Sequence, residues 1–465
     1  MVGRISGTRL RALLGQERSE QPTYLWVADG VRAAVADGRV LPGMRLPSER
    51  ELAPALGVSR TTVTRAYGVL VERGYARAEH GSGTRVTLPG GAAAGGGEPL
   101  ADEPIDPDTA NFMQAAPPAT PGLRAAFERA LEQLPRYTAG RGYFPYGIPP
   151  LREAIAQRYR DRGVVTTADQ IVVTTGATAA ASLALTSLTP RGVRVSLDSP
   201  GYPNTVAAVR AIGRRPVAVP AAGGEFDSEE FEQISKQAPA CLTVVDFKNP
   251  TGLLLDDADR DRLAHIWRSQ GTLAVVDETL CETWLEKRPD VLPMAAHHDA
   301  VITVGSASKT HWGGLRLGWV RAPRQQVRPL AVARRTTDLG SSVLDQLALA
   351  EMLAEQPGLH SDTRAALIES RDLLMDFGQQ RGWQAQRPSG GLSIWWRLPA
   401  PRSRQLVAAA AREGVGLLPG AAFAASGNGL DGFVRTPFAL RPHEIRELLP
   451  ALDRAAVTCG LVGSQ

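Results

Sequence analysis

A glycine- and alanine-rich stretch near residue 90 divides the chain into two unequal parts. Its sequence, Pro89-Gly90-Gly91-Ala92-Ala93-Ala94-Gly95-Gly96-Gly97-Glu98, has no apolar periodicity, and acidic, proline-rich residues continue to about Asp108. Such a composition is typical of a flexible linker. With 465 residues, the chain is too long for one ordinary domain. We therefore predict a first domain at 20–88, a linker at 89–110 and a second domain at 111–463.

The excess of basic residues lies at the start of the chain. Residues 1–88 hold 13 arginines, no lysine and 8 acidic residues, which gives a net charge of +5. The whole chain has a formal net charge of +4, so the remainder carries 4 − 5 = −1. Charge alone does not distinguish a DNA-binding surface from a solvated helical face, but the asymmetry favours a polyanionic partner for the first part.

The pattern inside the first part predicts a helix-turn-helix. Tyr24–Asp37 has the apolar spacing of an amphipathic helix. Ser48 begins a second helix, with Glu51 at the spacing of a capping box. Ser59 begins a third helix over about Arg60–Arg73, after a short turn that contains glycine. The second helix of such a pair contacts DNA through its first turn.

Two short segments after these helices predict a wing. Tyr75–Glu79 and Thr84–Leu88 have strand character and flank the glycine-rich tip His80–Gly83. A hairpin of this kind is suited to enter the minor groove beside the recognition helix.

Residues 20–88 resemble the GntR family of winged helix-turn-helix repressors. The resemblance rests on Leu46–Ala53, Gly57–Val63 and Gly81–Thr84. It implies DNA contacts from Arg50, Ser59, Arg60 and Thr61 in the helices and from His80 and Gly81 in the wing. Some relatives have a further basic DNA contact at the position of Thr64, which is not basic in this chain. The neighbouring Arg65 is expected to face elsewhere.

One lysine of the second part is informative because the chain has so few. The 52 basic residues include only the lysines Lys236, Lys248, Lys287 and Lys309. Lys309 follows the strand-like run Ala300–Val304, and Arg316 follows Lys309 in a glycine-rich loop. An amine at a strand end, with the Ser306 hydroxyl before it and a guanidinium after it, suits an aldehyde cofactor that carries a phosphate. The alternative is an ordinary surface lysine.

Other polar residues follow strand-like runs in the same way. Asp277 ends an apolar run, where a carboxylate can pair with a pyridinium nitrogen. Asn249 follows another run and can donate a hydrogen bond to a ring oxygen. Thr174–Thr178 opens an alanine-rich helix, an arrangement that binds anions, and Tyr202 offers a flat face for stacking. Taken singly, such an aspartate is most often a solvated cap, and an Asn-Pro pair is most often only a turn.

In this order and spacing, the residues from about Asn111 to the C-terminus resemble the fold-type-I pyridoxal-phosphate enzymes, the aspartate aminotransferase superfamily. The resemblance implies pyridoxal 5′-phosphate as the cofactor, with Lys309 as the Schiff-base lysine, Asp277 at the pyridine nitrogen and Asn249 at the phenolic oxygen. It places Gly176, Ala177, Thr178, Ser306 and Arg316 around the phosphate and Tyr202 over the ring.

The same resemblance supplies two more residues and one departure. Arg435 matches the arginine that binds a substrate α-carboxylate, and Tyr143 matches the aromatic residue that reaches the phosphate of the neighbouring subunit. The aminotransferases have a tyrosine two or three residues after the aspartate, whereas Asp277 is followed by Glu278–Leu280. The loss of that hydroxyl alters pKa and geometry at the cofactor. It puts efficient transamination in doubt, though not cofactor binding.

Both parts together resemble the MocR subfamily of bacterial regulators, in which a GntR head is fused to an aminotransferase-like body. The two matches cover nearly all of the chain. Asp246–Gly252 and Trp312–Arg316 resemble the branch of that subfamily that carries Asp-Glu-Thr-Leu after the strand, so the missing tyrosine is expected to be a feature of that branch.

The fold class is therefore expected to be α/β. It comprises an N-terminal winged helix-turn-helix, a flexible linker, and a fold-type-I body with a large, mostly parallel sheet domain and a small C-terminal α+β subdomain. Helical stretches such as Leu151–Tyr159 and Asp259–Trp267 alternate with β-rich runs, as in βαβ units. The small subdomain is expected to begin near Leu344 and to contain the strand Gly390–Trp396.

The remaining signals favour a cytoplasmic protein. The three cysteines, Cys241, Cys281 and Cys459, lack the spacing of a disulfide framework, so free thiols are expected. No run has transmembrane length, and the first residues lack the apolar core of a signal peptide. The pair His297-His298 is expected to be a solvated turn, and no metal site is predicted.

We therefore predict a pyridoxal-phosphate-dependent transcriptional regulator. Its partners would be double-stranded operator DNA, an amine, amino-acid or vitamin B6 effector, and a second copy in a head-to-tail, domain-exchanged homodimer, without a membrane. Effector binding at Lys309 would change the geometry of the body or the dimer and be relayed to the heads. Two alternatives stay open: a working aminotransferase with secondary DNA binding, and a repressor whose body senses the free cofactor without chemistry.

Overall fold

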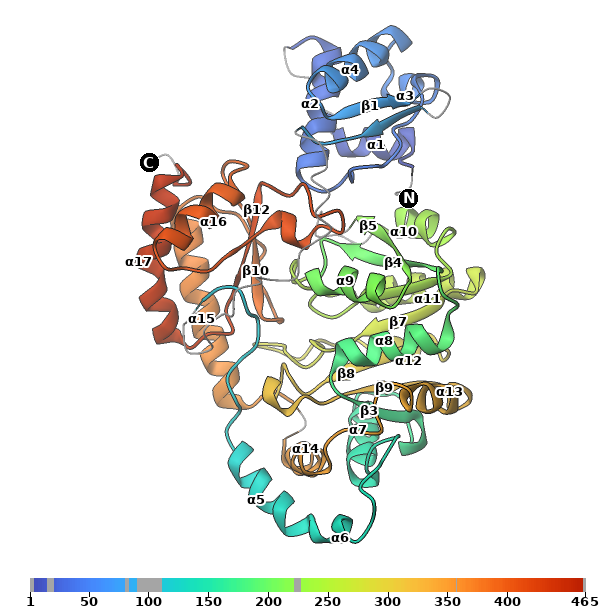
Figure 1. The fold of residues 1–465 in the computed structure, drawn as a ribbon. Helices are drawn as coiled ribbons and strands as arrows, with labels where there is room; N and C mark the ends of the chain where they lie inside the picture. Colours follow the sequence, from blue (N-terminus) through green and yellow to red (C-terminus); the bar gives the residue numbers. More distant parts are fainter. Residues whose placement is uncertain are drawn as a thin grey trace.

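The computed structural model describes residues 4–14, 21–79, 83–89, 111–220, 227–356 and 358–462. Figure 1 shows a small N-terminal head, in blue, next to a larger body that runs from cyan through green to red. Most of the predicted linker 89–110 lies outside the described residues, as do the predicted wing contacts His80 and Gly81.

The head contains the predicted helix-turn-helix and wing strands. Val31, Leu52 and Val63, from three different helices, are fully buried in one apolar core. A further helix at the start of the chain, not predicted from the sequence, adds Leu10 to this core. The elements are α1 (Gly7–Leu14), α2 (Thr23–Ala36), α3 (Glu49–Leu56), α4 (Arg60–Glu72), and the antiparallel strands β1 (Ala76–Glu79) and β2 (Gly83–Val86).

The two predicted helix starts are capped differently. The Ser59 side chain accepts a hydrogen bond from Thr62 N at 3.0 Å, which satisfies one free donor of α4. The capping box predicted at Ser48 and Glu51 is wrong, because Ser48 makes no side-chain cap hydrogen bond. Glu51 Oε1 instead accepts a hydrogen bond from Gly7 N at 3.2 Å, so the carboxylate is engaged by α1.

A seven-stranded sheet forms the centre of the body. Its order is β3-β9-β8-β7-β6-β4-β5, in which β9 is antiparallel to both neighbours and the other adjacent strands are parallel. The parallel strands therefore present their carboxyl ends at one edge, where ligands bind in open α/β sheets. The strands are β3 (Ile171–Thr174), β4 (Arg194–Ser199), β5 (Arg215–Pro220), β6 (Ala240–Val244), β7 (Leu273–Asp277), β8 (Ile302–Ser306) and β9 (Gly318–Arg321).

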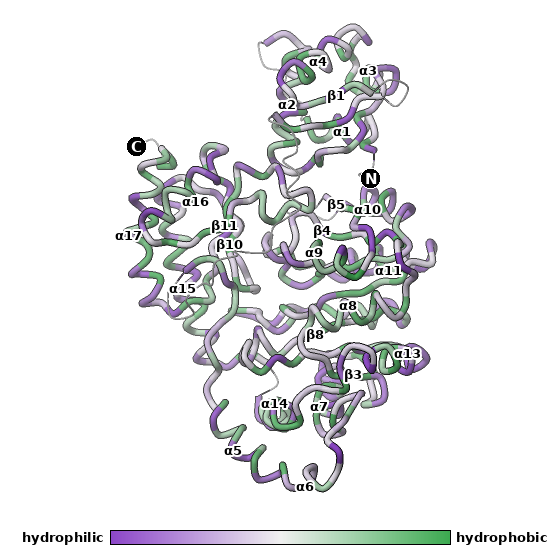
Figure 2. Tube along the Cα trace, viewed as in Figure 1, coloured by the Kyte–Doolittle hydropathy of each residue, from purple (hydrophilic) through white to green (hydrophobic). Residues whose placement is uncertain are grey.

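Helices cover both faces of this sheet, and each face of the sheet has its own apolar cluster. The first face carries α8 (Ala177–Leu188), α9 (Pro203–Ala211) and α13 (Arg324–Arg334). The second carries α5 (Leu123–Gln133), α7 (Pro149–Asp161), α10 (Ser228–Ser235), α11 (Asp257–Gln270) and α14 (Val343–Glu355). In Figure 2, α8 is mostly white to green, as expected for a helix packed against the sheet. Short elements in the connections are α6 (Pro135–Thr138), η1 (Ala168–Gln170), α12 (Met294–His297) and η2 (Gly313–Leu315).

The C-terminal part forms a smaller unit around an antiparallel sheet with the order β10-β12-β11. Its predicted start near Leu344 is wrong, because α14 buries Leu347 and Leu349 in the core of the large domain. In the C-terminal part, the residues that belong to the apolar cluster of the small unit begin at Leu359. The cluster also includes Phe112. Its elements are α15 (Ser361–Gln380), β10 (Ser393–Arg397), α16 (Ser403–Arg412), β11 (Leu418–Pro419), η3 (Gly420–Phe423), β12 (Phe433–Pro437) and α17 (Pro442–Thr458).

The head contacts the body beyond the β5 edge of the large sheet (Figure 1). Ala218 of β5 packs against the apolar core of the head. Arg9 of α1 forms an ion pair with Asp227 at 2.7 Å, and Arg397 of β10 forms one with Asp37 at 3.3 Å. A few polar contacts and one small apolar residue therefore hold the head against the body.

Two further sequence-based expectations concern the whole chain. The cysteines are free, as predicted, and burial raises the pKa of Cys241 and of Cys281 to about 12, so neither is a thiolate near neutral pH. Within the described ranges, no helix has both the length and the apolar composition needed to cross a membrane.

Candidate functional site

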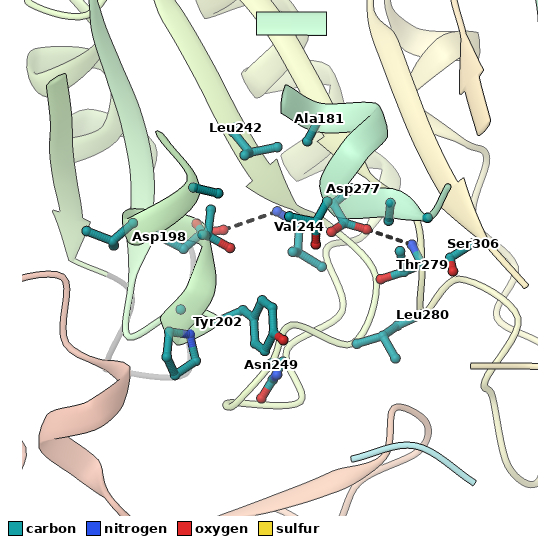
Figure 3. Close-up of a pocket in the computed structure, with 18 of the residues that line it drawn as sticks. Ala181, Asp198, Tyr202, Leu242, Val244, Asn249, Asp277, Thr279, Leu280 and Ser306 are labelled. Atoms are coloured by element: carbon teal, nitrogen blue, oxygen red, sulfur yellow. Dashed lines mark hydrogen bonds between the residues drawn. The ribbon is translucent and has the colours of Figure 1, made fainter. Parts of the chain in front are cut away.

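A cavity of about 670 Å³ opens at the carboxyl ends of the central strands (Figure 3). Segments far apart in the sequence contribute to its wall, because each follows a different strand or opens a helix beside one. Its lining includes these residues predicted to hold a cofactor: Gly176, Ala177, Thr178, Tyr202, Asn249, Asp277, Ser306, Lys309 and Arg316.

Lys309 lies just beyond β8 and is held by a backbone carbonyl. Its Nζ donates a hydrogen bond to Ala115 O at 2.7 Å. Burial, followed by the nearby charge of Arg435, lowers the pKa of Lys309 to about 8, and Asp277 opposes this shift. An appreciable fraction of the amine is therefore neutral near physiological pH, and the neutral amine is the form that attacks a carbonyl carbon.

Asp277 ends β7 and is held by Thr279. Thr279 N donates to Asp277 Oδ1 at 2.9 Å, a hydrogen bond drawn in Figure 3. Burial raises the pKa of Asp277, while hydrogen bonds from Thr279 and the charge of Lys309 oppose the rise. Thr279 was not predicted as a site residue, although its position two residues after the aspartate was a usable signal.

An anion cradle lies where β3 meets α8. Gly176 precedes the first turn of α8 with φ 122°, and a methyl group at this position would lie 3.2 Å from Arg316 Nη2. Arg316 itself adopts a left-handed backbone with φ 50°, a strained conformation for an arginine, and its Nη2 donates to Thr175 O at 3.3 Å. Backbone donors of a helix N-terminus and a guanidinium therefore converge on one small space.

Tyr202 and Asn249 line the cavity from two different loops (Figure 3). The Tyr202 side chain is 40% exposed, and its hydroxyl accepts a hydrogen bond from Asn204 Nδ2 at 3.0 Å. Asn249 Oδ1 is buried, and no described residue donates a hydrogen bond to it. Buried polar atoms normally have partners, so this oxygen is free to accept a hydrogen bond from a ligand.

Arg435, on β12, lies beside the cavity and does not form part of its wall. Its Nη2 donates to Met113 O, while its buried Nε has no hydrogen-bond partner among the described residues. Its guanidinium carbon lies 5.0 Å from the ring centre of Phe423, which does line the cavity. Burial lowers the pKa of Arg435 to about 10, so the side chain is still a cation at neutral pH.

Tyr143 is the one predicted cofactor contact that the structure places away from the cavity of its own chain. Its side chain is 64% exposed. A residue whose target belongs to a neighbouring subunit is expected to have such an exposed position.

Two features of the site were not predicted from the sequence. Lys248 Nζ lies 2.7 Å from Asp198 Oδ1, and Thr243 Oγ1 donates to Asp198 Oδ2 at 2.9 Å. The rarity of lysine was a signal for Lys248. The other feature, residues 111–116, which we name the leading segment, contacts Lys309 and Arg435 through backbone carbonyls. Every residue has a carbonyl, so the sequence carried no signal for these contacts.

In the head, the predicted DNA contacts of the two helices lie on the surface. Arg50 is on α3 and Arg60 begins α4, and no acidic side chain of the described residues pairs with either. Ser59 and Thr61 are exposed beside Arg60. Arg65 lies 3.9 Å from the ring centre of Tyr24 on α2, so it faces away from the start of α4, as predicted.

Residues 120–452 match the family model of aminotransferase class I and II, and residues 23–86 match that of the bacterial regulatory proteins of the gntR family. The chain belongs to the aminotransferase class I and II family. Its head is a GntR-type helix-turn-helix, and the fusion of the two is the architecture of the MocR-type regulators, as predicted.

The similar proteins include transcriptional regulators and an aminotransferase. The HTH-type transcriptional regulator TauR of Rhodobacter capsulatus is 28% identical over 91% of this chain and 94% of its own. The probable rhizopine catabolism regulatory protein MocR of Rhizobium meliloti is 29% identical over 72% of this chain and 73% of its own. The structure of LysN, an α-aminoadipate aminotransferase from Thermus thermophilus complexed with N-(5′-phosphopyridoxyl)-L-leucine, is 27% identical, has a TM-score of 0.66 and covers 76% of this chain and 93% of that one.

This member of the aminotransferase class I and II family differs from the family pattern beside its cavity. The family is pyridoxal-phosphate-dependent, and its usual tyrosine after the aspartate is absent here. Leu280 lines the cavity three residues after Asp277 and is 8% exposed. An aliphatic side chain at this place donates no hydrogen bond.

Proposed function

We propose that the chain is a transcriptional regulator that binds pyridoxal 5′-phosphate at Lys309 and responds to an effector with an amine. The observation that carries this proposal is the convergence of Lys309, Asp277 and Arg316 on one cavity, in a chain whose head is a GntR-type DNA-binding unit. The head would bind operator DNA through Arg50, Ser59, Arg60 and Thr61, with His80 and Gly81 at the wing.

The residues of the cavity fit this cofactor. When bound, pyridoxal 5′-phosphate supplies an aldehyde that condenses with amines and a ring that withdraws electrons. Lys309 would hold the aldehyde carbon, and Asp277 would pair with the ring nitrogen. The cradle at Gly176 and Arg316 would take the phosphate, helped by Ala177, Thr178 and Ser306. The amide nitrogen of Asn249 would donate a hydrogen bond to the ring oxygen, and Tyr202 would cover the ring.

Arg435 supports an effector that carries a carboxylate as well as an amine. Its buried Nε has no partner among the described residues, and its side chain keeps a positive charge. An anion would therefore form a strong, charge-assisted hydrogen bond here. The carboxylate would bond Arg435 while the amine is presented toward Lys309. We infer an amino acid as the effector class.

The leading segment offers a route from this effector to the head. Ala115 O accepts from Lys309, and Met113 O accepts from Arg435. An effector carboxylate at Arg435 would compete with Met113 O, and attachment of the cofactor to Lys309 would free Ala115 O. Because the segment continues directly into residues 89–110 and then into the head, the two ligands would bias its position and, through it, the position of the head.

A working aminotransferase is the second candidate, favoured by the family match. The absence of a hydroxyl at Leu280 argues against fast turnover, because the ring oxygen loses one donor. Incubation of the loaded protein with amino donors separates the candidates. A regulator should bind the donor with a change in absorbance and release little keto acid, whereas multiple turnovers would support the enzyme. A sensor of the free cofactor would show neither.

The lysine assignment is tested by borohydride reduction of the loaded protein and peptide mapping. We expect a pyridoxyl group on Lys309, because its amine is partly neutral and faces the cavity. Lys248 is the internal control, since its ammonium is paired with Asp198. Modification of Lys248 in place of Lys309 would overturn the site.

We further propose that the chain acts as a homodimer, head-to-tail and domain-exchanged. Tyr143 would reach the phosphate in the neighbouring cavity. The exposed Tyr143 and Leu339 support this, and they lie near each other, since a methyl group on Gly340 would come within 3.0 Å of Phe144 O. A two-fold dimer would also present two heads to two operator half-sites.

A further inference from the structure

Five arginines gather where β4 and β5 begin, at the edge of the sheet opposite to the cavity. Residues 189–220 contain one acidic residue, Asp198, and it is paired with Lys248. The positive charge is therefore local, although the body as a whole is close to neutral. The members of this arginine cluster are Arg191, Arg194, Arg210, Arg214 and Arg215.

The arginines are placed side by side by the backbone. Arg194 and Arg215 are direct register partners in the parallel pair β4–β5. Gly192 N donates to Gly213 O at 2.8 Å, which joins the loops before the two strands. A methyl group on Gly213 would lie 3.1 Å from Arg191 Nε, so Arg191 lies over the loop that leads to Arg215.

The charge of the cluster is not neutralised within the described part of the chain. None of its exposed members, Arg191, Arg210 and Arg215, has an acidic partner there. The buried Arg214 donates to Thr189 Oγ1 at 3.1 Å and otherwise to backbone carbonyls, which are neutral. Burial, and then the charge of Arg191, lowers the pKa of Arg214.

Most acidic side chains at the neighbouring helix α10 are engaged elsewhere, and among the described residues the exposed Glu229 is the exception. Asp227 and Glu230 contact Arg9 of the head. Glu232 pairs with Lys236 at 3.0 Å. Like charges directly opposite each other in a sheet lower its stability. An external anion at the arginine cluster would relieve this repulsion.

We propose that the arginine cluster binds the phosphate backbone of DNA that flanks the operator core, as a second DNA-contacting surface. The proposal rests on DNA binding by the head. The head contacts β5 at Ala218, and Arg215 lies three residues away on the same strand, roughly 10 Å along it. Figure 1 shows the head next to β5, the edge strand that begins at Arg215. A duplex presents closely spaced phosphates, so it can neutralise several arginines at once.

Fluorescence anisotropy of the full-length protein tests this surface with two duplexes. The probe is a duplex selected by the full-length chain from a random pool. It is trimmed to a core of about 20 base pairs, enough for two half-sites one helical turn apart, or extended on both sides by unrelated sequence. For the wild type, the longer duplex should bind more tightly and with a steeper salt dependence. The double substitution Arg210→Gln with Arg215→Gln should reduce the slope of log K against log salt by about 1.8 on the longer duplex. The double substitution should leave the slope for the core duplex unchanged.

A matched pair of substitutions controls for net charge. Lys287→Gln with Arg412→Gln removes two exposed cations away from the cluster and should leave both slopes unchanged. Arg60→Ala should weaken binding to both duplexes. This distinguishes a loss of DNA binding by the head from a loss of DNA binding by the arginine cluster. The Arg215→Gln change should not lower the midpoint of thermal unfolding, since it removes like-charge repulsion.

Three outcomes would overturn the proposal. Equal slopes for wild type and variant on the longer duplex would show that flanking DNA does not reach the cluster. Equal losses on both duplexes would place the effect in the head or in the fold. A rise in the unfolding midpoint with inorganic phosphate in the wild type alone, together with equal DNA slopes, would identify a site for a small anion.

Discussion

At the scale of single residues, the body holds two lysines in opposite electrostatic settings, Lys248 buried and Lys309 half-buried in the cavity wall. Lys248 has a carboxylate partner, Asp198, at 2.7 Å. Lys309 donates to the carbonyl of Ala115 and has the positive Arg435 close to it, and the charge of Asp277 offsets only part of the resulting fall in its pKa. Burial of a cation without an anionic partner destabilises the folded chain. The two lysines should therefore respond oppositely to the same substitution.

We expect Lys309→Met to stabilise the cofactor-free chain at pH 7. The pKa of Lys309 falls from 10.5 to about 8 on folding, so the charged amine lowers the stability of the folded chain by roughly 3 kcal/mol at pH 7. The free energy of unfolding measured in urea should therefore rise, by at most about 3 kcal/mol. Between about pH 8 and 10.5 the folded wild type binds fewer protons than the unfolded chain, so its stability increases with pH and the advantage of the variant should disappear.

Lys248→Met is the control for this prediction. It leaves Asp198 buried without its cation, so the free energy of unfolding should fall, by roughly 3 kcal/mol. If both substitutions destabilised the chain equally at pH 7, the low pKa assigned to Lys309 would be wrong.

The sequence predicted site residues whose side chains follow strands, such as Lys309 and Asp277. Those positions are readable because parallel strands end at one edge of a sheet. Thr279 and the carbonyls of Met113 and Ala115 were not predicted. A carbonyl contact depends on the path of the backbone, and residue types do not indicate which carbonyls that path brings to the site.

At the scale of elements, the start of α4 is where the head should bind DNA. Arg60→Ala is expected to weaken operator binding by about 1–3 kcal/mol and to reduce the salt dependence, because a cation at the first turn of the recognition helix is lost. A gel-shift titration at several salt concentrations measures both effects.

Arg65→Ala is the matched control on the same helix. Arg65 stacks on Tyr24 of α2, so its loss should change DNA affinity much less than the loss of Arg60. Equal affinities of wild type and Arg60→Ala would contradict the assignment of α4 as the recognition helix.

Elements with local signals were predicted well, and those set by distant contacts were not. Ser59 caps α4 as its position indicates, whereas Glu51 is captured by α1. α14 was assigned to the small unit, but its apolar residues face the large domain. Periodicity shows that a helix has a buried face, and tertiary packing decides which core receives that face.

At the scale of the whole molecule, the proposed dimer should belong to the body. A chain lacking residues 1–88 should still sediment as a dimer and retain its cofactor, because Tyr143 and the cavity residues lie beyond residue 110. Sedimentation velocity with absorbance detection measures both properties. A truncated chain that runs as a monomer or loses the cofactor would show that the heads make the interface.

Tyr143→Phe tests the crossing contact without removing the ring. We expect weaker cofactor retention and an unchanged sedimentation coefficient, because only the hydroxyl near the neighbouring phosphate is lost. Unchanged cofactor affinity would argue against a role for Tyr143 in the neighbouring cavity.

The two-part architecture was predictable because the glycine- and alanine-rich stretch and the charge asymmetry are properties of composition. The placement of the head was not predictable. It depends on pairs such as Arg9 with Asp227, which are far apart in the sequence and have no characteristic spacing.

The carbonyl contacts of the leading segment affect the effector concentration at which the regulator would respond. Met113 O accepts a hydrogen bond from Arg435, so in the proposed mechanism an effector carboxylate would reach Arg435 only in the fraction of molecules in which this carbonyl has moved away. If that fraction were about one in a hundred, the apparent affinity would be about a hundredfold weaker than the intrinsic one. The threshold at which transcription responds would then be set by residues 111–116 and the chain before them. Substitutions there should retune the regulator to a different concentration of the same molecule without altering a single effector contact.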